Sequence, residues 1–204
     1  MEFDLGRIGS LPPGEGRAFT AELDRIIAAN FTGDYWDISL PNRLDTSSSR
    51  SPVLFAYQAA LNILDAAMLF GDQRIRDLLL DPSVQPAKSV DRDNLFHRKA
   101  LAALGITDRR QVNAIANMAY VTWPADGPSN TDAPHDYWPR ITDGMDPRVL
   151  ERQVRWHALP VGWEQLDYFT FLERRRQLIA KVVPVGQRLV NGHPQRRGEL
   201  VTRH

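Results

Sequence analysis

The chain has 204 residues, 43% of them hydrophobic and 25% charged, which is enough for one sizeable core or for a core with a small helical lobe. Its 25 Lys and Arg residues balance its 25 Asp and Glu residues, which excludes a global basic field of the kind that attracts nucleic acid. The absence of cysteine excludes disulfides and thiolate metal sites, so any metal would need Asp, Asn or His.

The N-terminus is rich in Gly and Pro and has no apolar run, so we expect an extended lead-in over residues 1–18 and no signal peptide. The most apolar run, residues 53–70, is interrupted by Gln58, Asn62 and Asp65. Their spacing places them on one face of a helix, whereas a membrane span needs about 20 residues with almost no polar interruption. We therefore expect a cytoplasmic protein without a membrane partner.

Helices are predicted for the first part of the chain. The first covers about residues 20–30. A second begins where Ser51 can cap the helix and Pro52 suits its first turn, and we expect it to run to about Phe70. A shorter helix follows over 74–80.

The middle section, residues 86–142, has a different pattern. A short strand and turn are predicted over 88–96, and a short helix follows that Gly105 ends. The segment 113–123 alternates weakly and carries β-branched and aromatic residues, which favours a second strand. Another short helix begins at about His135.

The last section is helical. Asp146 and Pro147 predict the start of a helix that ends near His157, and a longer helix follows over the region 168–182. Its apolar face is formed by Tyr168, Phe171, Leu172, Leu178, Ile179 and Val182.

The predicted fold class is α+β and predominantly helical, with a small β-plus-helix core inserted between helical segments. We expect one domain over 19–190 that contains this insert at about 86–142. The polar residues 191–204 are expected to be disordered.

The insert concentrates the side chains that could carry chemistry. Asp and Asn oxygens suit hard divalent ions such as Mg²⁺, and a metal nuclease also needs a general base and a group that orients it. By spacing alone, ordinary turn chemistry is the favoured explanation of these residues, because Asp and Asn are the usual loop residues. The set comprises Asp91, Asp93, Asn94, His97, Asn113, Asn117, Asp126, Asn130, Asp132 and His135.

A family resemblance adds to this pattern. The segment DRDNLFHRKALAALGITDRRQVNAIANMAYVTW, followed by SNTDAPHDYW, resembles the HNH (ββα-metal, His-Me finger) nuclease domain at the C-terminus of GmrSD-type restriction proteins. HALPVGWEQLDYFTFLERRRQLIAKVV is similar to the helix that closes that domain, and SPVLFAYQAALNILDAAMLFGDQRIRDLLLDP to the segment before it. The similarity covers roughly residues 20–185, in several blocks that follow the same order.

The resemblance implies a ββα-metal core, a divalent cation (Mg²⁺ or Mn²⁺) and cleavage of double-stranded phage or modified DNA in a bacterial restriction or anti-phage system. A sensing or nucleotide-binding domain, or a partner subunit, would accompany it. Asp93 and Asp126 would hold the metal, with Asn130 in place of Asp126 after a small register shift. Asn113 and Asn117 match a block in which the family uses an Asn to orient the catalytic His.

The sequence departs from the family at the general base. Asn94 stands where the family has His, and His97 stands where Pro is usual. A neutral amide cannot accept the proton. Three explanations stay open: His97 has taken over the role, the substitution at Asn94 inactivates the enzyme by design, or the domain has become a non-catalytic DNA- or protein-binding module.

Four basic residues are candidates for DNA contacts, namely Arg98, Lys99, Arg174 and Arg175. Arginine gives bidentate, salt-sensitive contacts to phosphates. Solvated helix faces and structural ion pairs are the competing interpretations, since one arginine of the run 174–176 must face inward or lie beside the apolar stripe. His157 is expected to be structural.

Overall fold

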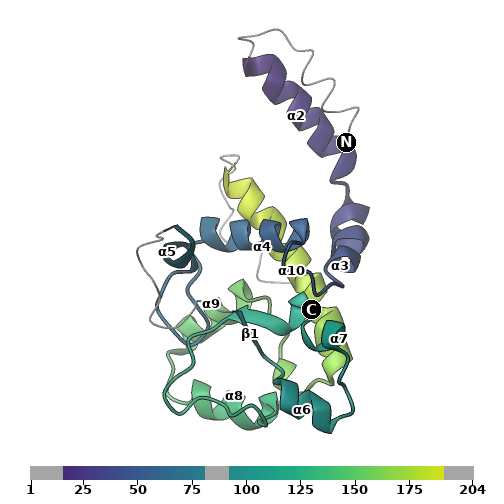
Figure 1. Cartoon of the computed structure of the whole chain (residues 1–204). Coiled ribbons are helices and arrows are strands. Elements are labelled where there is room, and N and C mark those ends of the chain that lie inside the picture. Colours follow the sequence, from purple (N-terminus) through teal and green to yellow (C-terminus); the bar gives the residue numbers. More distant parts are fainter. Residues whose placement is uncertain (1–15, 81–91, 191–204) are drawn as a thin grey trace. The chain divides into compact units, whose positions relative to one another are not determined.

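A computed structural model of the chain describes residues 16–80 and 92–190 (Figure 1). The described residues fall into two compact units that divide between Leu40 and Pro41, whereas the sequence predicts one domain over 19–190.

The outer boundaries differ from the predicted ones in one respect. Residues 16–18, which we predicted to belong to the lead-in, are helical. The rest of the predicted lead-in and the predicted disordered tail at 191–204 lie outside the described residues.

The first unit contains helix α2 (Gly16–Asn30) and the π-helical turn η1 (Tyr35–Ser39). Between them, the ring of Phe31 lies 4.7 Å from that of Tyr35 and 5.5 Å from that of Trp36. The indole Nε1 of Trp36 donates a hydrogen bond of 3.1 Å to the carbonyl oxygen of Phe31. Aromatic stacking and this bond together stabilise the turn that follows α2.

The helices that begin the second unit are shorter than predicted. A short helix, α3 (Leu40–Arg43), leads into it. Helix α4 (Pro52–Ile63) ends seven residues before the predicted end at Phe70, because Asp65 adopts a left-handed φ of 52° that breaks the helix. Helix α5 (Ile75–Leu80) follows, close to the predicted position.

The residues between α4 and α5 join the sheet instead of continuing the helix. Leu69 donates its backbone N–H to the carbonyl oxygen of Tyr120 at 2.9 Å and accepts from the N–H of Thr122 at 2.9 Å. Buried Gln153 holds the next turn, since its Oε1 accepts from Phe70 N and its Nε2 donates to Gly71 O.

The sheet has two antiparallel strands, β1 (Arg92–Asn94) and β2 (Met118–Tyr120), with Asp93 opposite Ala119. Between the strands lie α6 (Arg98–Ala103), α7 (Arg109–Val112) and the 3₁₀ turn η2 (Ile115–Asn117). Both strands are where the sequence predicts them, but β2 is shorter than the predicted 113–123.

The remaining elements agree with the predicted order. Helix α8 (Pro134–Thr142) follows the loop after β2, and α9 (Pro147–Trp156) is capped by Asp146, whose carboxylate accepts from Arg148 N at 2.7 Å. The 3₁₀ turn η3 (Trp163–Gln165) then leads to the long helix α10 (Tyr168–Val190).

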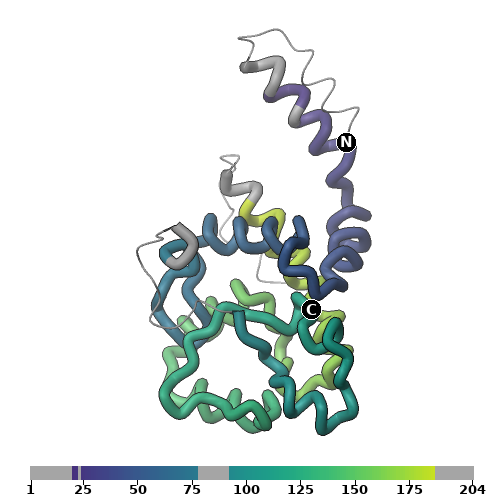
Figure 2. Tube along the Cα trace, viewed as in Figure 1, coloured from purple at the N-terminus to yellow at the C-terminus, as the bar shows by residue number. Residues whose placement is uncertain are grey.

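The core of the second unit lies between α10 and the other elements. Helix α10 packs along α4 (Figure 2), and a Cβ atom at Gly186 would lie 2.8 Å from Cα of Ala60, so the two helices approach closely because Gly186 has no side chain. Leu95, Leu101, Tyr137, Trp163 and Phe171 are fully buried around the sheet and the adjoining helices.

The described residues are therefore mostly helical, with one small antiparallel sheet, which is the α+β class that the sequence predicts. Among residues 16–80 and 92–190, no helix is both long and apolar enough to cross a membrane.

Candidate functional site

Asp93 lies in the middle of β1 and is held from two directions. Its Oδ1 accepts a hydrogen bond of 2.7 Å from the backbone N–H of Asn94, and its Oδ2 accepts one of 2.7 Å from the indole Nε1 of Trp123. Each carboxylate oxygen has a second lone pair, so these bonds leave capacity for a cation. The contacts fix the carboxylate in one orientation on the half-buried strand.

His97 stands at the start of α6 and is only 4% exposed. Its Nε2 is buried without a hydrogen-bond partner in the described part of the chain. The ring centroid lies 5.7 Å from those of both Trp123 and Tyr137. Because buried polar atoms are almost always paired, this nitrogen needs an explanation.

The electrostatic surroundings of His97 connect it to two carboxylates. Burial lowers the pKa of His97 below its usual value, while the negative charges of Asp93 and Asp132 oppose that shift. The imidazole is therefore neutral at pH 7, and its neutral form can accept a proton or bind a metal ion.

Asn117 is fully buried at the end of η2, and all of its polar side-chain atoms are hydrogen-bonded. Its Oδ1 accepts from Phe96 N at 2.8 Å, and its Nδ2 donates to Phe96 O and to Val112 O, both at 3.0 Å. The side chain thus fixes the backbone of the residue that directly precedes His97. Asn117 therefore acts on the position of His97 through the backbone of Phe96 and not by a bond to the imidazole.

Helix α8 is fixed to the end of β1 by a tyrosine. The hydroxyl of the fully buried Tyr137 donates a hydrogen bond of 2.7 Å to the carbonyl oxygen of Leu95. Strand β1, strand β2 and α8 therefore meet around Asp93 and His97, and α6, α7 and η2 lie between the two strands along the chain.

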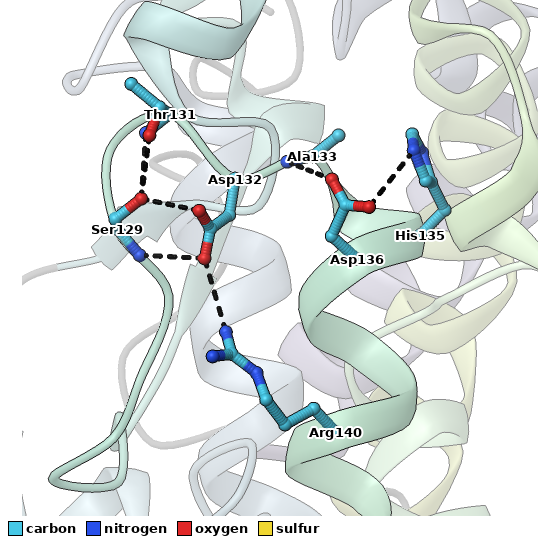
Figure 3. A network of polar contacts seen from close by, with 7 residues as sticks. All are labelled: Ser129, Thr131, Asp132, Ala133, His135, Asp136 and Arg140. Carbon is cyan, nitrogen blue, oxygen red and sulfur yellow. Dashed lines mark hydrogen bonds and ion pairs between the residues drawn. The ribbon is translucent and has the colours of Figure 1, made fainter.

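The loop before α8 ends in a polar network that Figure 3 shows. Ser129 donates to the carboxylate of Asp132 through both its backbone N–H and its hydroxyl, and Arg140 forms an ion pair with the same carboxylate at 3.2 Å. The hydrogen bonds from Ser129, followed by the charge of Arg140, lower the pKa of Asp132. Asp132 is thus firmly ionised, and it is the loop carboxylate whose charge acts on His97.

The other predicted site residues are not drawn into this group. Asp126 and Asn130 are exposed in the same loop, and neither makes a hydrogen bond or ion pair within the described residues. Asn113 ends α7 and lines a separate hollow with Ser47. Within residues 16–80 and 92–190, no three His, Asp or Glu side chains are grouped in a way that could hold a metal ion.

The candidate DNA contacts divide between surface and interior. Arg98, Lys99 and Arg174 are exposed. Arg175 is fully buried, and its guanidinium donates to the carbonyl oxygens of Ala116 at 2.8 Å and of His157 at 3.2 Å. The prediction that Arg175 contacts DNA is therefore wrong: it is the arginine of the run that faces inward.

Three neighbours of His97 were not singled out by the sequence pattern. These neighbours are Trp123, Tyr137 and Asp132, the last of which is one of several acids in the insert. Asp132 had a local signal, because a Ser three residues before an Asp is typical of a hydrogen-bonded turn before a helix. The contacts of Trp123 and Tyr137 join residues 30 and 42 positions apart, which no local pattern reveals.

No family model, curated protein or solved structure matches the chain.

Proposed function

We propose that the second unit is an HNH-type, divalent-metal-dependent DNA endonuclease or nickase domain of a bacterial restriction or anti-phage system. The observation that carries the proposal is the meeting of β1, β2 and α8 around Asp93 and His97. A strand–strand–helix unit with an acid on its first strand is the arrangement that the resemblance implies.

Asp93 is the residue that we propose to hold Mg²⁺ or Mn²⁺. Its carboxylate offers hard oxygen ligands, and the bonds from Asn94 N and Trp123 Nε1 orient it in advance. When bound, the cation would stabilise the charge that develops on a phosphate and would activate water. Asp126 and Asn130 are exposed, so either would need to approach Asp93 to complete the site.

The proposed site has no strong general base at the position where the family has His. Asn94 has no basic nitrogen, and losing a general base typically lowers a rate by about 10² to 10⁴. His97 is neutral at pH 7 and has an unpaired Nε2, but it is covered to 96% of its surface. We therefore propose weak activity, with His97 as the base among the described residues near Asp93 and with Asn117 fixing the turn before it.

A second candidate function is a non-catalytic DNA- or protein-binding module on the same scaffold. The observation that favours it is the burial of His97 beside an Asn at the base position. This candidate predicts binding without hydrolysis.

Nicking of supercoiled plasmid with Mg²⁺ or Mn²⁺ distinguishes the two candidates. The variants are Asn94→His, His97→Gln and Asp93→Ala, with Glu151→Ala as a matched control because Glu151 is an exposed acid on α9. We expect weak parental cleavage that Asp93→Ala abolishes and that Asn94→His increases by about 10² or more.

Loss of the parental activity in His97→Gln would identify His97 as the base. If neither the parent nor Asn94→His nicks the plasmid, the nuclease proposal is overturned in favour of the binding module. Cleavage that persists in Asp93→Ala would exclude the proposed metal ligand.

A further inference from the structure

A polar groove lies in the second unit away from the Asp93 site. A cavity of about 800 Å³ opens between the loop after α3, helix α7 and the first half of α10. A neighbouring hollow, which Arg109 also lines, shares Ser47 and Arg110 with it, so the two adjoin and are together called the groove. Neither Asp93 nor His97 lines either part.

The groove contains two arginines that are free to bind an anion. Arg109 and Arg110 are exposed, and neither guanidinium makes an ion pair or hydrogen bond in the described part of the chain. Two acids of the lining are already engaged. Asp108 accepts from the backbone N–H groups of Arg110 and Gln111, and Asp45 forms an ion pair with Arg176.

Hydroxyl groups lie beside these arginines. The loop presents Thr46, Ser47 and Ser48 to the cavity, and a hydroxyl can donate a hydrogen bond to a phosphate oxygen. Two hydrogen bonds hold this loop in place. Thr46 O accepts from Ile115 N of η2 at 2.8 Å, and Ser48 N donates to Thr46 Oγ1 within the loop at 3.1 Å. Its conformation therefore does not depend on a ligand.

The opposite wall supplies an aromatic surface. Phe169 is 52% exposed at the start of α10, and its ring is available on the groove side because the residue lines the cavity. Exposed phenylalanine rings stack with nucleobases, and such stacking tolerates any base. Glu173 is the acidic lining residue without a hydrogen bond or ion pair among the described residues, and its charge disfavours a highly charged ligand.

We propose that this groove binds a nucleotide unit, with its phosphate at Arg109, Arg110 and Ser47 and its base against Phe169. Guanidinium groups bind phosphate oxygens through paired hydrogen bonds, and the cavity is large enough for one nucleotide. The unit belongs either to a free nucleotide or to a single strand of nucleic acid, since both present the same phosphate and base. The proposal does not depend on the nuclease activity.

Equilibrium binding to the full chain tests the proposal. The probes are adenosine monophosphate and a fluorescently labelled ten-residue oligothymidylate, both in the presence of a chelator so that no metal contributes. The variants are Arg110→Gln and Phe169→Ala, and Arg148→Gln is the matched control because Arg148 is an exposed helical arginine outside the groove. All three positions are on the surface, and thermal unfolding checks that each variant is folded.

We expect Arg110→Gln to weaken binding about tenfold, which is the usual effect of losing a charge-assisted contact, and Arg148→Gln to change it less than twofold. Phe169→Ala should weaken binding about fivefold for both nucleotide probes. The affinity for inorganic phosphate, measured by competition with a nucleotide probe, should be the same in Phe169→Ala as in the parent, because phosphate has no base to stack.

The two probes distinguish the sources of the ligand. Arg110-dependent binding of the monophosphate identifies a free nucleotide, and Arg110-dependent binding of the oligonucleotide alone identifies a strand. Equal affinities in the parent and Arg110→Gln, or no binding of either probe at millimolar concentration, would overturn the proposal. The chelator keeps the Asp93 site without a metal ion and no groove variant touches Asp93, so a failure of the nuclease proposal leaves this result unaffected.

Discussion

The two buried histidines of the second unit differ in what their Nε2 atoms contact. His157 is 1% exposed, and its Nε2 hydrogen-bonds to Ala67 O at 3.0 Å. His97 is 4% exposed, and its Nε2 has no partner in the described residues. Burial lowers the pKa of both, to about 4 for His157, but only His97 has carboxylates that oppose the shift.

This contrast separates structural polar groups from candidate functional ones. A buried polar atom costs free energy unless it is paired, and His157, like Asn117, is paired with backbone. His97 retains an unpaired nitrogen beside Asp93, which is the expected state of a group whose partner is a ligand. Pairing, rather than burial or residue type, therefore distinguishes the two histidines.

The largest effect that we predict concerns the residue that positions His97. Asn117→Ala leaves Phe96 N, Phe96 O and Val112 O without partners, so it should lower the free energy of unfolding by about 3–5 kcal/mol. Asn113→Ala is the matched control, because Asn113 is half-buried and its side chain makes no hydrogen bond among the described residues.

Urea unfolding measures both variants, and the control should change the free energy of unfolding by less than about 0.5 kcal/mol. Equal effects at the two positions would show that the three bonds of Asn117 do not fix the turn before His97.

Acid should destabilise the protein through His157. Its folded pKa of about 4 lies below the ordinary value of 6.5, so the unfolded chain binds the proton more tightly. The free energy of unfolding should therefore fall by about 3 kcal/mol as the pH drops from 6.5 to 4, and this contribution should be fully present above pH 6.5.

Urea unfolding at several pH values measures this slope, and His157→Gln should make it shallower because Gln does not titrate. A slope that is unchanged in His157→Gln would assign the acid sensitivity to other groups.

A pair of substitutions tests the comparison at both histidines. His157→Leu leaves Ala67 O unpaired and should lower the free energy of unfolding by about 2 kcal/mol. His97→Leu removes a polar atom that has no partner, so its effect should be close to zero or stabilising by up to about 1 kcal/mol. A large loss of stability in His97→Leu would mean that His97 is a structural residue.

The sequence predicts the elements with strong local signals. The helix after Asp146 and Pro147 begins where predicted, because the carboxylate of Asp146 caps the first turn. Gly105 ends α6 with a φ of 80°, as its position after the apolar run indicates. The end of α4 was predicted wrongly, since the pairing of Leu69 with β2 overrides a continuous apolar pattern.

The candidate site is less accessible from sequence. Asp93, His97 and Asn117 lie in the segments that the motif blocks indicate, and the sequence also predicts that one arginine of the run 174–176 faces inward or lies beside the apolar stripe. It does not identify Arg175 as that arginine. Helical periodicity alone places the neighbouring arginines close to the boundary between the apolar face and the solvent-facing side of the helix as well. Nor does it reveal that Trp123 binds the Asp93 carboxylate, because that contact depends on the register of β1 against β2.

The most direct test of the central claim, that Asp93 holds a divalent cation, is a Mn²⁺ titration followed by NMR of the Trp123 indole N–H. This proton is hydrogen-bonded to the Asp93 carboxylate, so a paramagnetic ion bound there must broaden its signal. We expect broadening at substoichiometric Mn²⁺ in the parent chain and its loss in Asp93→Asn. A signal that stays sharp in the parent, or that broadens equally in Asp93→Asn, would contradict cation binding at Asp93.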